Sequence, residues 1–262
     1  MATAPYRKFL TVADTAARQT GPMLVKYAGR PKSVLTKRSA IDLVTEIDKA
    51  AETRLRRAIL SAFPDHGIFG EEHARINPDS PYQWIIDPID GTTNFVHGVP
   101  YFAISIGLAL RGTLIAGLVY DPTRPEMFSA VKGGGAKLNG RRISVSPAKR
   151  LEDSLLSTGF PSDFRKDPSK YLGWFRAFQD QCHAVRRTGS TALSLAYVAC
   201  GRQDGFYETN LWPWDIAAGI LLVEEAGGRV TDFTGRPAVV GTGRSELVAS
   251  NRHIHRSILA LL

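Results

Sequence analysis

The sequence predicts a layered protein of the α+β or α/β class, and three observations predict it. The chain has 262 residues, enough for one large domain or two closely packed halves. Its content of 44% hydrophobic and 22% charged residues is that of an ordinary globular protein. Segments with helical periodicity alternate with short apolar runs in both halves, which favours helices layered on sheets. We expect an N-terminal half, residues 1–150, and a C-terminal half, residues 151–262, packed closely as one unit.

Two amphipathic helices are predicted first, over residues 5–28 and 45–63. Apolar side chains recur at helical spacing along one face of each segment. Thr45 with Asp48 resembles a capping box, which marks the start of the second helix. The rest of the N-terminal half reads as strands, expected over residues 68–69, 83–86, 102–110, 113–120, 127–131 and 136–138.

Two turns connect strands in this half. Arg111-Gly112 separates two apolar runs and predicts a hairpin. Gly133-Gly134-Gly135 predicts a second hairpin. This glycine run is not a Walker loop, because no Gly-Lys-Ser/Thr follows at the required spacing.

The C-terminal half alternates strands and helices. Strands are expected over residues 154–158 and 204–208, and helices over 171–178, 191–200 and 216–226. Gly227-Gly228 predicts the end of the last helix. That helix contains Ala217-Ala218-Gly219, small residues that allow close packing against a sheet or another helix.

Membrane and secretory features are not expected. No apolar run approaches the roughly 18 residues of a membrane span, and the N-terminus lacks the apolar core of a signal peptide. Cys182 and Cys200 have no metal-ligand spacing and are interpreted as reduced core thiols of a cytoplasmic protein. The six histidines, including His253 and His255, are expected at the surface or in the tail.

The most informative stretch runs from Trp84 to Thr93. An apolar strand leads into Asp87 and Asp90, and Pro88 between them predicts that the strand stops at Asp87 and the backbone turns. Both acids are then delivered to a strand end, where open α/β folds bind ligands. Gly91-Thr92-Thr93 would open a helix whose free N–H groups suit a phosphate. Because two acids repel a phosphate unless cations lie between them, the pattern indicates metal-assisted phosphate chemistry.

The alternative is that Asp87 and Asp90 only cap a turn, which is the better reading of an isolated D-x-x-D. Here Asp87 adjoins one of the most apolar strands of the chain, where an uncompensated charge is costly. Three further carboxylates have similar alternatives: Glu71 in a surface loop, Asp48 in a first helical turn, and Asp215 as the N-cap of the helix that follows it.

Charge is unevenly distributed along the chain, whose net charge is +8. Residues 61–100 hold 1 basic and 6 acidic side chains, whereas residues 1–60 hold 12 and 5, and residues 101–150 hold 8 and 2. An acidic segment inside a basic chain fits a metal pocket framed by a field that attracts phosphorylated anions. A basic surface also permits nucleic-acid binding, but no compact Lys/Arg run with interleaved aromatic residues supports it.

The chain resembles the inositol monophosphatase family, in particular its bacterial branch. The resemblance runs from about Lys37 to Gly228. The motifs that carry the resemblance are Asp42-Leu43-Val44-Thr45-Glu46-Ile47-Asp48, Gly70-Glu71-Glu72, Trp84 through Gly98, Thr158-Gly159-Phe160-Pro161 and Trp214-Asp215-Ile216-Ala217-Ala218-Gly219. The resemblance implies alternating α-β-α-β-α layers and a magnesium-dependent, lithium-sensitive phosphatase that hydrolyses inositol monophosphate. It also implies a homodimer.

The same resemblance implies roles for individual residues. Glu71, Asp87 and the Ile89 carbonyl would hold one Mg²⁺, and Asp87, Asp90 and Asp215 a second. A weaker third ion would lie near Glu71, linked through water towards Asp48, and Lys37 matches a basic residue beside it, although a solvated surface lysine is the competing reading. Glu71 and Thr92 would activate the attacking water. The phosphate would meet Gly91, Thr92 and Thr93, and the alcohol would meet Asp90, Ala192 and Glu208, with Asp215 beside them.

The donor set supports magnesium independently, because oxygen ligands without His or Cys suit a hard cation better than zinc. Relatives in the superfamily act on fructose 1,6-bisphosphate, histidinol phosphate or nucleotide 3′-phosphates, so these substrates stay open. Some bacterial relatives are associated with RNA or the transcription machinery, which makes a mainly binding role the alternative from another class.

Overall fold

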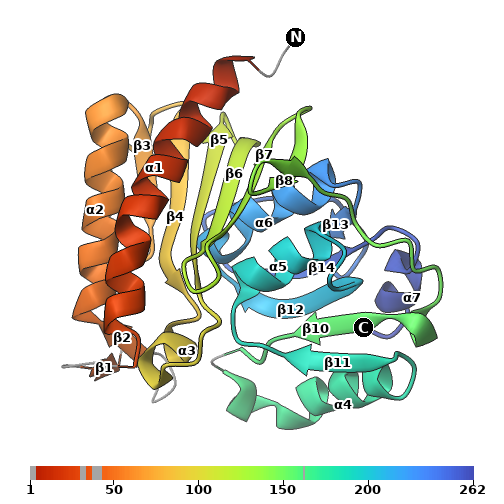
Figure 1. Ribbon diagram of the computed structural model, residues 1–262. Helices are drawn as coiled ribbons and strands as arrows, with labels where there is room; N and C mark the ends of the chain where they lie inside the picture. The colour runs from red at the N-terminus through yellow and green to blue at the C-terminus, as the bar shows by residue number, and fades with distance from the viewer. Residues whose placement is uncertain (1–3, 30–33, 37–42, 162) are drawn as a thin grey trace.

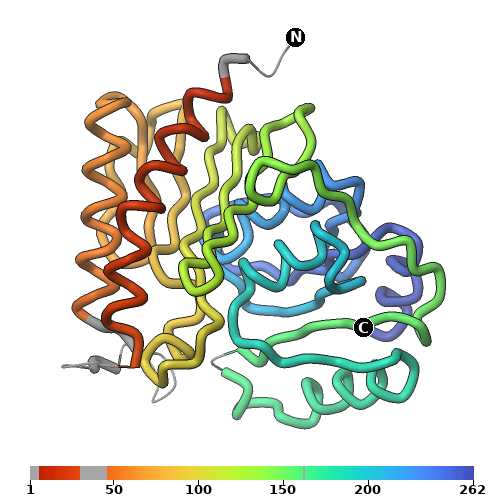
Figure 2. Tube along the Cα trace, viewed as in Figure 1, coloured from red at the N-terminus to blue at the C-terminus, as the bar shows by residue number. Residues whose placement is uncertain are grey.

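The computed structural model describes residues 4–29, 34–36, 43–161 and 163–262. These residues form five layers, two of sheet and three of helix (Figure 1), which confirms the predicted architecture. Figure 2 follows the same chain as a tube, with the red and orange N-terminal helices on the left and the blue C-terminal segments on the right. Lys37 and Asp42 lie outside the described residues. No helix within the described ranges is long and apolar enough to cross a bilayer.

The first two layers are a pair of helices and a seven-stranded sheet. The helices are α1 (Ala4–Tyr27) and α2 (Glu46–Ala62), as predicted. The sheet has the order β3-β4-β5-β6-β7-β8-β9. Its strands are β3 (Gly67–Gly70), β4 (Tyr82–Asp90), β5 (Ala103–Leu110), β6 (Thr113–Asp121), β7 (Glu126–Val131), β8 (Gly135–Leu138) and β9 (Arg141–Arg142). The short antiparallel pair β1 (Val34–Thr36) and β2 (Leu43–Thr45) stands apart from it.

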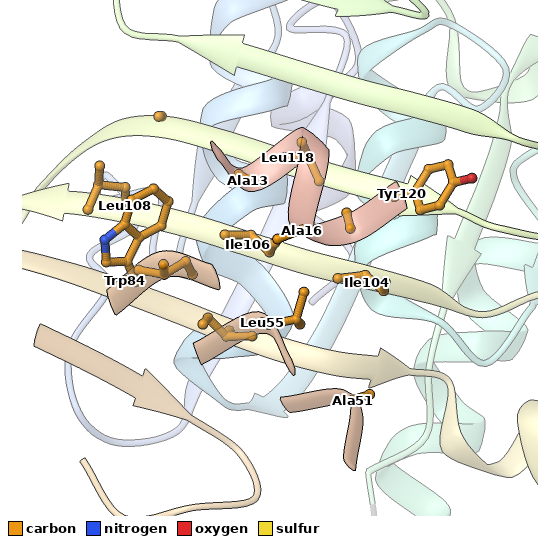
Figure 3. Packing of buried hydrophobic residues seen from close by; sticks show 14 of the residues in the cluster. Ala13, Ala16, Ala51, Leu55, Trp84, Ile104, Ile106, Leu108, Leu118 and Tyr120 are labelled. Atoms are coloured by element: carbon orange, nitrogen blue, oxygen red, sulfur yellow. The ribbon is translucent and has the colours of Figure 1, made fainter. Parts of the chain in front are cut away.

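The apolar stripes of α1 and α2 explain how this helix pair covers the sheet. Ala13 and Ala16 of α1 and Leu55 of α2 pack on Trp84 and Ile106 of the strands (Figure 3). All of these side chains are at most 2% exposed. Because small alanines face large strand residues, α1 lies close to the sheet and contributes to the hydrophobic cluster on this face of it.

The central layer consists of α5 (Thr191–Ala199) and α6 (Pro213–Glu225), which cover the other face of the seven-stranded sheet. Gly107 and Gly117 are register partners on β5 and β6 beneath α6. A Cβ at Gly117 would stand 2.9 Å from the Ala218 carbonyl oxygen, and one at Gly107 would stand 2.8 Å from the Ala217 Cβ. The small residues of α6 therefore meet small residues of the sheet, as the sequence predicts.

This contact leads to a stability prediction. Gly117→Ala is expected to lower the free energy of unfolding by about 1–3 kcal/mol, because the added methyl group meets backbone that cannot move aside. Gly173→Ala is the matched control, since Gly173 is exposed in α4 (Pro168–Gln179) and its Cβ would meet nothing within 4 Å. That control should raise stability by about 0.5–1 kcal/mol through helix propensity. Urea unfolding of both variants measures the difference, and equal stabilities would contradict the proposed close packing.

The second sheet has five strands in the order β11-β10-β12-β14-β13. Its strands are β10 (Leu155–Thr158), β11 (Ala184–Arg187), β12 (Gly205–Leu211), β13 (Arg229–Thr231) and β14 (Ser245–Ser250). β10 runs parallel to both neighbours, whereas β14 is antiparallel to β12 and β13. The outer layer is α4 and α7 (His255–Leu259), and short 3₁₀ turns occupy Leu151–Asp153 and Phe164–Lys166.

Three smaller predictions are settled by the fold. Both cysteines are free thiols. The predicted hairpin at Gly133–Gly135 is confirmed, because β7 and β8 on either side of it pair antiparallel, and Gly133 N and Gly135 N each donate to the Glu225 carboxylate at 2.7 Å. The surface placement of the histidines is wrong for His255, which is buried and hydrogen-bonded to Thr231 and Ser250. Burial lowers the pKa of His255 to about 4.

Candidate active site

Asp87 and Asp90 lie at the end of β4, whose last residues adjoin the short helix α3 (Thr92–His97). The predicted stop at Asp87 is wrong, because the strand continues to Asp90. Its pairing with β5 shifts register between these two acids, so Pro88 falls where no ladder hydrogen bond is required of it. Both carboxylates are buried, at 2% and 7% exposed, and Asp87 accepts a hydrogen bond from Ile89 N at 2.9 Å.

Glu71 and Asp48 come from two neighbouring elements. β3 runs parallel to β4 with Gly70 paired to Ile86, so Glu71 follows at the same sheet edge as Asp87. Asp48 lies buried in the first turn of α2. Burial raises the pKa of Asp87 well above its usual range, and the charges of Glu71, Asp90, Asp215 and Asp48 raise it further. Four carboxylates therefore act on Asp87 at close range.

Asp215 reaches Asp87 and Asp90 from α6, in the central layer of helices. The predicted N-cap position is wrong: Trp212 is the N-cap of α6 and Asp215 is its third residue. There its carboxylate accepts the Trp212 N–H at 2.7 Å. Carboxylate oxygens of Asp87, Asp90 and Asp215 all lie within 4.8 Å of one another. Burial, followed by the charges of Asp90 and Glu71, raises the pKa of Asp215 well above its usual range.

The start of α3 directly follows the strand that carries Asp87 and Asp90. Gly91 has φ +98°, a left-handed conformation that favours glycine, and turns the chain from β4 into the helix. The Thr92 hydroxyl donates to the Ile89 carbonyl at 3.1 Å, whereas Thr93 is exposed. The helix start that the sequence predicts is confirmed, and it follows Asp90 by one residue, Gly91.

Asp90 is held by the N-terminus of α5. Its carboxylate accepts hydrogen bonds from the Ser190 hydroxyl, from Ala192 N at 2.8 Å and from Thr191 N at 3.2 Å. Burial raises the pKa of Asp90 to about 6, and these hydrogen bonds oppose the rise. Ser190 was missed from the sequence as a site residue, although its place just before a predicted helix was a usable signal. The Ala192 N–H, expected on the substrate side, is already donated to Asp90.

Glu208, on β12, is the last of the predicted site residues. It accepts a hydrogen bond from the Thr191 hydroxyl at 3.2 Å, and burial raises its pKa to about 8. A Cβ at Gly159 would collide with the Glu208 carboxyl group, so the glycine of the Thr158–Pro161 motif makes room for this side chain. Asp90, Glu208 and Gly159 line a cavity of about 90 Å³. The cavity joins the acid cluster to the second sheet.

Buried carboxylates in this arrangement need positive charge between them. Two like charges about 4 Å apart at an effective dielectric near 20 cost on the order of 4 kcal/mol. Burial raises the pKa values of Asp87 and Asp215, and repulsion from the neighbouring carboxylates raises them further. An all-oxygen donor set of this kind fits Mg²⁺, which prefers hard oxygen ligands.

Comparison with known proteins identifies the family of nearly the whole chain. Residues 6–262 match the inositol monophosphatase family. The chain belongs to this family.

Relatives of the inositol monophosphatase family cover almost the entire chain. The Escherichia coli (strain K12) protein named Nus factor SuhB is 44% identical over 253 residues, which is 96% of this chain and 94% of the relative. Among solved structures, the extragenic suppressor protein suhB of Bartonella henselae aligns with a TM-score of 0.91 and 39% identity, covering 97% of this chain and 98% of that one. An inositol monophosphatase from Anabaena aligns with a TM-score of 0.88 and 40% identity, covering 98% and 96%.

Proposed function

We propose that the chain is a magnesium-dependent phosphomonoesterase that hydrolyses inositol monophosphate to inositol and phosphate. The observation that carries the proposal is the meeting of Asp87, Asp90 and Asp215, from β4 and α6, within 4.8 Å of one another. Family membership supports it, because magnesium dependence is general in the inositol monophosphatase family. The Anabaena structure, described as an inositol monophosphatase, supports the choice of substrate.

Each acid has a place in this proposal. Glu71, Asp87 and the Ile89 carbonyl would hold one Mg²⁺, and Asp87, Asp90 and Asp215 a second. Asp48 would take part, through water, in holding a weaker third ion. When bound, paired ions of this kind lower the pKa of a water molecule and stabilise the leaving alkoxide.

The remaining residues bind and orient the reactants. Glu71 and Thr92 would orient the attacking water, and the Thr92 hydroxyl is already fixed by its bond to the Ile89 carbonyl. The N–H groups at the start of α3, over Gly91, Thr92 and Thr93, would receive the phosphate.

The alcohol side of the substrate would meet Asp90, Ala192 and Glu208. Burial raises the pKa of Glu208 to about 8 in the metal-free protein, and its carboxyl oxygens can accept a hydrogen bond from a polyol hydroxyl. Any Ala192 contact to substrate would share an N–H that already holds Asp90.

Phosphate release from a panel of inositol, sugar, histidinol and nucleotide phosphates, with and without Mg²⁺, tests the proposal. We expect magnesium-dependent release, fastest from inositol monophosphate. If another member of the panel is hydrolysed fastest, the assignment as a phosphatase stands, but the substrate is that of a related sugar or metabolite phosphatase. No release from any member would overturn the proposal. Lithium sensitivity, a homodimer and a cytoplasmic location stay predictions.

A second candidate is a binding role associated with transcription. Its support is the name Nus factor SuhB of relatives that are 44% identical, together with the basic surplus in residues 1–60 and 101–150. A gel shift with RNA at physiological salt, run beside the phosphate-release assay, separates the two roles. A shift without phosphate release would favour binding alone.

Ser105 leads to a prediction about the metal site. It is fully buried on β5 as the register partner of Asp87, and its hydroxyl donates to the Trp214 carbonyl of α6 at 3.1 Å. It therefore fixes the distance between the elements that carry Asp87 and Asp215. Ser105→Ala is expected to weaken Mg²⁺ binding by about 10-fold, the lower end of the effect of residues that orient metal ligands.

Calorimetric titration with Mg²⁺ measures this effect without an activity assay. Ser157→Ala is the matched control, because Ser157, on β10 of the other sheet, is an equally buried serine whose hydroxyl donates to Gln203. The control should lose stability but keep the affinity for Mg²⁺. Equal affinities in the two variants would show that Ser105 has no positioning role.

A further inference from the structure

A buried pair of opposite charges follows Asp48 along α2. Glu52 and Arg56 come after Asp48 at intervals of four residues, so the three side chains lie on one face of the helix. Glu52 is 0% exposed and Arg56 is 7% exposed, and the Arg56 Nη1 donates to Glu52 Oε1 at 2.6 Å. A buried ion pair can often be replaced by apolar residues of similar volume without loss of stability. The packing of α2 on the sheet therefore does not by itself account for this pair.

The pair holds the backbone that follows Glu71. The second oxygen of the Glu52 carboxylate, Oε2, accepts the Glu72 N–H at 2.6 Å. The second terminal nitrogen of Arg56, Nη2, donates to the Ala74 carbonyl oxygen. Each member of the ion pair thus uses one atom for its partner and one atom for the loop after β3.

The residue before Glu71 lies against the same carboxyl group. A Cβ at Gly70 would collide with the Glu52 carboxyl group, so glycine at this position makes room for it. Glu52 therefore contacts the chain on both sides of Glu71, whose charge acts on Asp87. Both oxygens of Glu52 have donors of their own and its charge is balanced by Arg56, so it has the bonds of a support for the loop.

We propose that Glu52 is a positioning residue for Glu71. Together with Arg56 it fixes residues 70–74 before any metal binds, so that Glu71 can take up Mg²⁺ without the entropic cost of ordering the loop. The inference rests on the magnesium site proposed above and adds to it a residue that acts through Glu71.

Glu52→Gln tests this role. A carboxylate offers an acceptor oxygen to each of its two donors, whereas an amide has one oxygen and an NH₂ group. Either Arg56 or the Glu72 N–H would then face another donor, and the loop would loosen. We expect the affinity for Mg²⁺ in a calorimetric titration to fall roughly 10–100-fold.

Asp121→Asn is the matched control. Asp121 is a fully buried carboxylate that also accepts from one arginine, Arg124 at 2.7 Å, and from one backbone N–H, that of Thr123 at 2.8 Å. It lies on β6, two strands away from β4 in the sheet. The control should lose stability and keep the wild-type affinity for Mg²⁺. Equal affinities in Glu52→Gln and the wild-type protein would overturn the proposal.

Anomalous diffraction from Mn²⁺-soaked crystals of Glu52→Gln shows which ion is affected. The peak shared by Asp87 and Glu71 should lose occupancy, whereas the peak shared with Asp90 and Asp215 should remain. A purely structural role for Glu52 would not separate the two peaks, so equal loss at both would contradict positioning.

Arg56→Lys is a second variant that leaves no unpaired charge in the core. Lysine keeps a cation for Glu52 but lacks the second arm that reaches the Ala74 carbonyl. We expect the same selective loss at the Glu71 peak, smaller than in Glu52→Gln. Wild-type occupancy of that peak in Arg56→Lys, if Glu52→Gln does not fold, would overturn the proposal.

Hydrogen exchange in EDTA keeps this inference separate from the catalytic proposal. The Glu72 N–H should exchange faster in Glu52→Gln than in the wild-type protein even without metal, and unchanged exchange would overturn the role of Glu52. A wild-type protein that binds Mg²⁺ but releases no phosphate would reject only the phosphatase function. One that binds no Mg²⁺ would reject the metal site and this inference together.

Discussion

Asp90→Asn is expected to remove nearly all magnesium-dependent phosphate release, by about 10²–10³-fold or more, the scale on which one charge-stabilising group matters. The residue combines two functions in the proposed site. Its carboxylate lies within 4.8 Å of those of Asp87 and Asp215, and it borders the cavity that leads to Glu208. Asparagine has nearly the same shape but one charge fewer, so the loss reports on charge.

The fold should survive this substitution. An asparagine oxygen can still accept the N–H of Ala192 at the start of α5, which Asp90 now accepts at 2.8 Å. Asp204→Asn is a matched control, because Asp204 is another buried aspartate that accepts a backbone N–H, from Leu155 at 2.6 Å, far along the second sheet. The control should lower stability while keeping the turnover of the folded protein. Wild-type turnover in Asp90→Asn would remove the assignment of this site.

Asp215→Asn is expected to have opposite effects on stability in the absence and presence of magnesium. Without metal, removing one of the mutually repelling carboxylates should raise the free energy of unfolding by up to about 4 kcal/mol, the cost of a close like-charge pair. The asparagine side chain can still accept the Trp212 N–H, so the start of α6 is preserved. With Mg²⁺ the wild-type protein should gain stability and the variant should gain little.

The pH dependence of the metal-free protein gives this prediction a second readout. The pKa values of Asp87 and Asp215 are raised above their usual range, so the folded state holds protons that the unfolded state has lost. Stability contributed by these groups is therefore highest at low pH and falls as the pH rises above about 4, the usual Asp value. Asp215→Asn should flatten this fall. Thermal melts in EDTA and in Mg²⁺ between pH 5 and 8 measure it, and identical melting curves for variant and wild type would contradict the charge cluster.

Much of the site could be predicted because its residues lie in local patterns. The apolar run ending in Asp87 and Asp90, and the glycine that opens α3, are readable within ten residues. The two errors at this site are errors of local geometry. Pro88 does not end β4, because a register shift against β5 removes the need for its N–H. Asp215 is the third residue of α6, because Pro213 takes the first helical position.

The missed features depend on contacts between distant segments. Ser190 holds Asp90 from 100 residues away, and Ser105 reaches Trp214 across 109. Such pairs have no local signature, and only the layered packing of α5 and α6 between the sheets brings them together. β14 was missed for a related reason: its buried face is recognisable only when β12 and β13 flank it. The family resemblance predicted the convergence of the acids, but the partners that hold them required the structure.

The proposed division into halves at residues 150 and 151 stays a prediction. The seven-stranded sheet ends with β9 at Arg142, and the five-stranded sheet begins with β10 at Leu155. However, α6 from the C-terminal half packs on β5 and β6 of the other half. The two sheets therefore share one layer of helices.

The most direct measurement is anomalous diffraction from crystals soaked in Mn²⁺, an oxygen-preferring substitute for Mg²⁺. We predict at least two anomalous peaks beside Asp87, one shared with Glu71 and one shared with Asp90 and Asp215. Fewer than two peaks at these carboxylates would contradict the proposal that they hold a pair of cations.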